Sequence, residues 1–123
     1  MLAAFYSRVL NTARSQNPSV KVLIALGGWT DSESDKYSRL VADQAAINKF
    51  VSKAKAFVRN LNFDGLSLEW QYPVCWQSYC NKGPPSDKQG FSNLVKVRLE
   101  ITGGKSADFK ALFSLMFCPI LFG

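Results

Sequence analysis

Two short strand-like segments on either side of a long amphipathic stretch constrain the fold of this chain most strongly. Val20–Leu26 is a nearly continuous run of branched apolar residues, which is typical of a parallel strand covered on both faces. Between residues 47 and 61, apolar side chains recur every three or four positions. This spacing predicts an amphipathic helix of about four turns, with Asp43 as its N-cap. Residues 63–72 then alternate between apolar and polar side chains, which is the period of a strand.

The segments around this unit complete an alternating pattern. Residues 2–15 have helical apolar spacing, and residues 30–38 and 73–85 are expected to be loops. Ser86 and Gln89 have the spacing of a capping box, which predicts a further helix beginning there. The order helix, strand, helix, strand, helix predicts an α/β fold built from parallel βαβ units. From Ile101 onward the pattern ends, so residues 101–123 are expected to form a divergent apolar tail.

The strand at residues 63–72 has one unusual face. Its apolar set is Leu66, Leu68 and Trp70, and its polar set is Ser67, Glu69 and Gln71. Because buried polar groups without partners are costly, the polar set must line a cavity, a wet channel or a ligand site, unless this is an edge strand with one face in water. In a closed barrel, polar inward residues at the carboxyl end of a strand lie at the mouth of the active site, where Gln71 would be.

Composition excludes several classes of protein. The chain has no histidine, which excludes His-based catalysis and His-rich metal sites, and we expect neither a metal nor a cofactor. A net charge of +6 would suit a polyanion, but the basic residues are scattered among acids, so nucleic-acid binding is not expected. The 13-residue apolar stretch at residues 111–123 is too short to span a membrane, and the N-terminus does not resemble a signal peptide.

The three cysteines leave two interpretations open. Their spacing does not fit a zinc knuckle or a redox CxxC site. Cys75 and Cys80 either form a disulfide, which would fit an oxidising compartment, or are two free thiols in a loop. Cys118 is the unpaired third cysteine.

Two motifs resemble glycoside hydrolase family 18. Phe63–Pro73 reads FDGLSLEWQYP, which resembles the family signature FDGxDxDxEYP, and Leu26–Trp29 resembles the (S/A)xGGW end of the preceding barrel strand. Pro73–Gln77 is similar to arthropod chitinases, and the resemblance extends from about residue 4 to residue 96. It implies part of a TIM (β/α)8 barrel, about two βα units and a preceding helix, with the partial domain at residues 1–100. It also implies an extracellular chitin-binding protein.

The signature differs from the family pattern at all three acidic positions. In active members the last glutamate protonates the glycosidic oxygen, the second aspartate orients the N-acetyl group of the substrate, and the first supports the second. These roles fall on Gln71, Glu69 and Ser67 of this chain. An amide has no proton to give, so the resemblance implies a site without a general acid.

The aromatic residues near the motifs are candidates for sugar binding. Tyr72, Trp29 and Trp76 would stack on sugar rings or form the wall of a cavity, and for each tryptophan structural packing is the alternative. The leading hypothesis is a chitinase-like chain that binds chitin or N-acetylglucosamine oligomers without cleaving them. The alternatives are an active chitinase in which Glu69 replaces the missing acid and a truncated, non-functional remnant.

Overall fold

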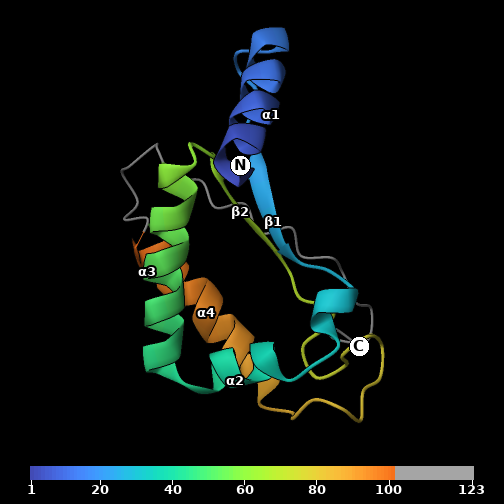
Figure 1. The fold of residues 1–123 in the computed structure, drawn as a ribbon. Coiled ribbons are helices and arrows are strands. Elements are labelled where there is room, and N and C mark those ends of the chain that lie inside the picture. Colours follow the sequence, from blue (N-terminus) through green and yellow to red (C-terminus); the bar gives the residue numbers. More distant parts are fainter. Residues whose placement is uncertain (102–123) are drawn as a thin grey trace.

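The computed structural model describes residues 1–101, with side chains as far as Val97. Two parallel strands form its sheet, β1 (Leu23–Gly27) and β2 (Gly65–Glu69). Between them the chain forms the 3-10 turn η1 (Thr30–Ser32) and the helices α2 (Lys36–Ala42) and α3 (Gln44–Asn60). Helix α1 (Leu2–Gln16) precedes β1, and α4 (Asp87–Ile101) follows β2 (Figure 1). The predicted α/β class and the parallel pairing are confirmed for the described residues.

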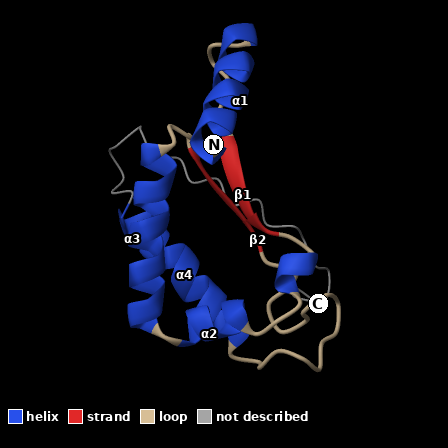
Figure 2. Cartoon of the chain, viewed as in Figure 1, coloured by secondary structure: helices blue, strands red, loops and turns tan. Residues whose placement is uncertain are grey.

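The register of the two strands places like residues side by side. Ile24 pairs with Leu66 and Leu26 with Leu68, while Gly27 pairs with Glu69. Figure 2 shows α2, α3 and α4 on one side of the two strands, with α1 at the end where the strands begin. The carboxyl ends of both strands meet η1 and the loop that follows β2. These segments therefore surround the sheet edge at which ligands generally bind in open parallel sheets.

The core lies between the strands and the three helices. Leu68 and Trp70 from the β2 segment pack with buried residues of the helices, which are Tyr37, Val41, Ile47 and Leu94. The Trp70 ring lies 5.7 Å from the Tyr37 ring and 6.1 Å from the Phe91 ring. Leu68 and Trp70, two members of the apolar set of this strand, therefore pack beneath the helices as core residues.

Both strands are shorter than the sequence pattern predicts, because neighbouring groups occupy the backbone at their ends. The Val20 N–H donates to the Asn17 carbonyl in a turn, and the Val22 N–H donates to the Asp64 carboxylate, so β1 begins only at Leu23. Beyond Glu69, the Gln71 N–H donates to the Ser32 hydroxyl. The β ladder predicted over residues 63–72 is thus limited to five residues.

The helices confirm two predictions and correct two others. The Asp43 side chain caps α3 by accepting a hydrogen bond from the Ala45 N–H at 3.1 Å. Residues 30–38 are not a simple loop, because they contain η1 and the start of α2. The predicted capping box is wrong: α4 begins where expected, but the Gln89 side chain donates to Asn93 instead of reaching back to Ser86. Ile101, the first residue of the predicted apolar tail, is the last residue of α4, and residues 102–123 of that tail lie outside the described residues.

Candidate functional site

The polar face of β2 contains the three residues that the sequence singles out. Ser67 and Gln71 are buried, with 6% and 7% of their surface exposed, while Glu69 is half-buried. In the described part of the structure the Ser67 hydroxyl has no hydrogen-bond partner. A buried hydroxyl without a partner is costly, which is consistent with a face that a ligand or further chain would complete.

Gln71 lies two residues past the end of β2, and its backbone is held from two directions. Its N–H donates to the Ser32 Oγ at 2.8 Å, and its carbonyl accepts a hydrogen bond from the Gln77 N–H at 2.8 Å. Ser32 is fully buried and donates in turn to the Gly28 carbonyl at 2.7 Å. The loop after β1 therefore fixes the position of the residue that stands where the family signature has its acid.

The carboxyl ends of β1 and β2 approach each other very closely. The Gly28 N–H donates to the Glu69 carbonyl at 2.7 Å. Gly27 has a φ of +113°, and a Cβ at this position would lie 2.6 Å from the Glu69 carbonyl oxygen. Only glycine fits both this backbone conformation and this contact. The glycines of the Leu26–Trp29 motif thus bring the loop after β1 against the backbone of Glu69.

The loop after β2 is closed by a disulfide and held by one buried carboxylate. Cys75 and Cys80 form the disulfide. Asp87, at the start of α4, is 1% exposed, and its Oδ2 accepts hydrogen bonds from the Val74 N–H at 2.9 Å and the Ser38 hydroxyl at 2.8 Å. The Trp76 indole N–H donates to Ser38 Oγ at 3.1 Å and lies 3.3 Å from Asp87 Oδ2. Asp87 therefore joins the loop to α2 and α4.

The three aromatic candidates have different environments. Trp29 is 50% exposed, so the packing interpretation does not describe it, and its carbonyl accepts a hydrogen bond from Gln77 Nε2 at 3.0 Å. Because Gln77 also contacts the Gln71 carbonyl, it links Trp29 to Gln71. Trp76 is half-buried, packs against the core, and its indole N–H is already used within the protein. Tyr72 is half-buried beside this loop.

An ionic cluster supports the segment after β1. The Asp31 carboxylate accepts hydrogen bonds from Lys36 and from the Tyr37 hydroxyl. These two contacts hold the pKa of Asp31 below its ordinary value. Burial, together with the Asp31 carboxylate, raises the pKa of the Tyr37 phenol. Asp31 is therefore ionised and Tyr37 neutral at neutral pH, and their contact holds η1 against α2.

The described residues contain no cluster of three or more histidine, cysteine, aspartate or glutamate side chains that could hold a metal ion. Across the same residues, no helix combines the length and apolarity that crossing a bilayer requires.

Sequence reasoning missed the residues that hold the site together. Ser32, Ser38 and Asp87 are all buried and polar, and all act through hydrogen bonds to segments distant in the chain. Each lies in a polar stretch that reads as loop or helix start, so nothing in the local pattern distinguishes them from solvated residues. Gln77 has no predicted role of its own, because the sequence distinguishes it only as the last residue of Pro73–Gln77.

Comparison with known proteins decides the family. The sequence profile of Glycosyl hydrolases family 18 matches residues 4–115, which is most of the chain. The chain belongs to glycoside hydrolase family 18. It is 48% identical over 92 residues to probable chitinase 10 of Drosophila melanogaster and 36% identical over 102 residues to chitinase A1 of Niallia circulans. These alignments cover 75% and 82% of this chain.

Solved structures of family 18 chitinases share the fold of this chain. Catalytic domain 2 of the Ostrinia furnacalis Group II chitinase, a mutant in complex with (NAG)5, is 52% identical and superimposes with a TM-score of 0.73 over 79% of this chain. A double mutant of the Cycas revoluta family 18 chitinase in complex with (GlcNAc)4 is 34% identical, with a TM-score of 0.60 over 74% of this chain. The family resemblance predicted from the sequence is confirmed.

The chain corresponds to a small part of these relatives. It covers 4% of the Drosophila protein, 14% of the Niallia protein and 24% of each of the two solved structures. The TIM barrel is the fold of the family, and the two parallel strands with their helices match one portion of it.

Proposed function

We propose that this chain binds chitin or N-acetylglucosamine oligomers at the carboxyl ends of its strands and does not hydrolyse them. The observation that carries the proposal is Gln71. It stands at the signature position of the general acid, with its backbone fixed by Ser32 and Gln77. A glutamine side chain donates and accepts hydrogen bonds but cannot protonate a leaving group, so binding persists where bond cleavage does not.

The neighbouring positions support the loss of turnover. Glu69 retains a carboxylate but is one methylene longer than the aspartate of the signature, which misplaces it for holding an acetamide. Ser67 lacks the charge that would support it. We infer that Ser67, Glu69 and Gln71 line the sugar site, with Tyr72, Trp29 and Trp76 as its aromatic residues. Of these, Trp29 has the most exposed indole and is the best placed to stack on a sugar ring.

The ligand class follows from the relatives. The chain is similar in sequence to chitinases of Drosophila and Niallia, and the Ostrinia and Cycas structures are mutants in complex with (NAG)5 and (GlcNAc)4. In the Cycas double mutant one substitution replaces a glutamate with glutamine, and the oligosaccharide is bound. We further propose an extracellular location, because the disulfide is stable in an oxidising compartment. The chain would supply about two βα units of a barrel, with residues 1–100 as the partial domain.

Binding is tested by isothermal titration of the chain with a chitin hexasaccharide. Gln71→Leu removes the amide at almost the same size, and we expect affinity to fall about 2- to 10-fold, the value of one neutral hydrogen bond. Gln89→Leu, an exposed glutamine on α4, is the matched control and should leave affinity unchanged. Equal affinities for both variants and the unmodified chain would place the ligand elsewhere.

Two alternatives make different predictions. If Glu69 replaces the missing acid, the purified chain releases sugar from a soluble chitooligosaccharide, and Glu69→Gln abolishes the release. If the chain is a non-functional remnant, it neither adheres to chitin beads nor unfolds in a cooperative thermal transition. Adherence and cooperative melting without sugar release support the binding proposal.

A further inference from the structure

Gln77 connects the two loops that follow the strands. Its side-chain Nε2 donates to the Trp29 carbonyl at 3.0 Å, and its backbone N–H donates to the Gln71 carbonyl at 2.8 Å. The backbone of Gln77 is thus attached to the residue at the signature position of the acid. Its side chain is attached to the exposed tryptophan of the loop after β1.

The backbone around Trp29 needs such support. Trp29 follows Gly27 and Gly28, which both have positive φ, and glycine is the residue whose backbone is least restricted. The indole is 50% exposed, so packing alone does not fix it. The Trp29 carbonyl accepts the Ser32 N–H at 3.2 Å from within its own loop and the Gln77 amide from the other loop. The two hydrogen bonds together restrict how the indole is presented.

The turn that contains Gln77 directs its side chain. Gln77 and Ser78 have φ values of 49° and 68°, in the left-handed region. Residues with a side chain seldom adopt this conformation, and such positions are concentrated at functional sites. The Ser78 N–H donates to the Cys75 carbonyl at 2.9 Å, and the disulfide to Cys80 closes the turn. The fold therefore maintains an unfavourable backbone at the residue that reaches the other loop.

We propose that Gln77 is a positioning residue of the sugar site. Its amide holds the backbone of Trp29 so that the indole is already oriented to stack on a sugar ring. This role rests on the proposed function, because it assumes that the oligomer contacts Trp29. Ordering a side chain in advance reduces the entropy lost on binding, so Gln77 raises affinity without touching the ligand.

A double-mutant cycle with Trp29 tests this role. Gln77→Leu removes the amide at almost the same size, and isothermal titration with a chitin hexasaccharide should show about 2- to 10-fold weaker binding, the effect of freeing one side chain. In a Trp29→Ala background the backbone carbonyl remains but no indole is positioned. Gln77→Leu should then weaken binding by less than about twofold. Gln77→Glu keeps the size, presents no N–H at neutral pH, and should behave as Gln77→Leu does.

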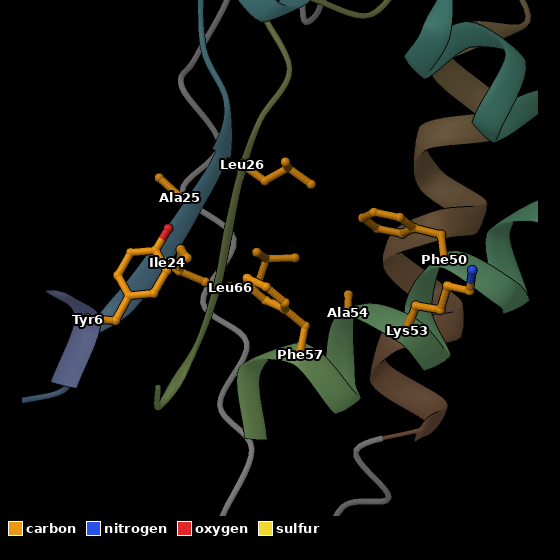
Figure 3. Close-up of a pocket in the computed structure, with 9 residues that line it drawn as sticks. All are labelled: Tyr6, Ile24, Ala25, Leu26, Phe50, Lys53, Ala54, Phe57 and Leu66. Atoms are coloured by element: carbon orange, nitrogen blue, oxygen red, sulfur yellow. The ribbon is translucent and has the colours of Figure 1, made fainter. Parts of the chain in front are cut away.

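The control for a general loss of stability is Phe57→Ala, at the other end of the strands. Phe57 points from α3 into an open apolar pocket of about 490 Å³ between this helix and the sheet (Figure 3). Residues of α1, β1 and β2 also line the pocket, among them Tyr6, Ile24, Leu26 and Leu66. The Phe63 N–H donates to the Val58 carbonyl at 3.0 Å, so this end of α3 lies where β2 begins. Phe57→Ala should lower the melting temperature and leave the affinity for the hexasaccharide unchanged.

A spectroscopic measurement separates this role from sugar binding itself. In the chain labelled with fluorotryptophan, the fluorine resonance of Trp29 is assigned by its absence from Trp29→Phe. Without ligand, it should shift in Gln77→Leu and stay in place in Phe57→Ala, while far-UV circular dichroism verifies folding. If the unmodified chain does not bind the hexasaccharide, the proposed function fails, and the resonance alone decides whether Gln77 positions Trp29.

Three results would overturn the role of Gln77. They are an unshifted Trp29 resonance in Gln77→Leu, an unchanged affinity of this variant in a chain that binds, and an equal loss of affinity with and without the Trp29 indole. The last result would mean that Gln77 contacts the sugar itself or acts through the fold as a whole.

Discussion

At the scale of single residues, buried polar groups determine how the candidate site is built. Asp87 accepts hydrogen bonds from the Val74 N–H in the loop after β2 and from the Ser38 hydroxyl of α2. The Trp76 indole N–H points at the Ser38 hydroxyl and the Asp87 carboxylate. Gly83 leaves the space that this contact needs, because a Cβ at this position would lie only 2.7 Å from both Asp87 Oδ2 and Trp76 Nε1. One carboxylate thus sets the position of a loop that contributes a candidate sugar-binding residue.

Asp87→Asn should therefore destabilise the fold. The amide cannot accept all the donors that the carboxylate accepts, and a buried donor left without a partner costs about 1–3 kcal/mol. We expect the free energy of unfolding to fall by about 2–4 kcal/mol, measured by urea titration. Asp35→Asn is the matched control. It removes an exposed pair with Arg39 and should change stability by less than about 1 kcal/mol. Equal losses would contradict the role of Asp87.

The acids of the fold also predict a pH dependence. Burial by itself raises the pKa of Asp64, but the Val22 N–H and the Arg14 guanidinium hold it below the ordinary value of 3.8. Because the unfolded chain binds this proton first, the stabilisation is complete above about pH 4 and is lost as pH falls through the folded-state pKa. We expect the melting temperature of the unmodified chain to fall as the pH is lowered below about 4. The fall should be less steep for Asp64→Asn, which lacks this titrating group. Parallel pH profiles would contradict this account.

The polar face of the β2 segment could be predicted from the sequence, but the contacts that hold its neighbours in place could not. The alternation that predicts a polar face on residues 63–72, and the signature position of Gln71, depend only on local pattern. The environments of Trp29 and Trp76 do not, because they depend on Gln77 and Asp87, which act across the loop and from α4. Long-range hydrogen bonds leave no periodic signal in the sequence.

At the scale of elements, the close approach of the two strand ends shapes the site. Gly27 and Gly28 both have positive φ, but only a Cβ at Gly27 would collide with the Glu69 backbone, because a Cβ at Gly28 would have no atom within 4 Å. Helix α2 could not be predicted from local sequence signals. It has only seven residues and no side-chain cap, so the segment resembles a loop in sequence. The helix is stabilised by burial of Tyr37 and Val41 in the core.

Alanine substitutions at Gly27 and Gly28 distinguish the cost of a positive φ from the cost of a steric clash with the Glu69 backbone. Gly28→Ala imposes only the backbone penalty of a positive φ, about 1–2 kcal/mol. Gly27→Ala adds a contact at 2.6 Å to backbone that cannot move without disturbing β2, and we expect it to lose at least about 1 kcal/mol more. Thermal unfolding of both variants measures the difference. Equal losses would indicate that the close approach is relaxed in solution.

At the scale of the whole molecule, three helices cover one side of a two-stranded sheet, while relatives of the family extend well beyond the matched portion. The parallel βαβ order and the core on the helix side could be predicted from periodicity, because both follow from which side chains are apolar. The open pocket beside α3 could not, because it depends on how α1 and α3 are placed relative to the strands.

The central claim is that the site holds a chitin oligomer without a proton donor for the glycosidic bond. It is tested most directly by mixing the purified chain with a stoichiometric amount of chitin hexasaccharide and following the sugars by mass spectrometry over a day. We predict that the hexasaccharide is retained intact with the protein and that no shorter oligomers accumulate. Steady appearance of shorter oligomers, abolished in Glu69→Gln or Gln71→Leu, would contradict the account.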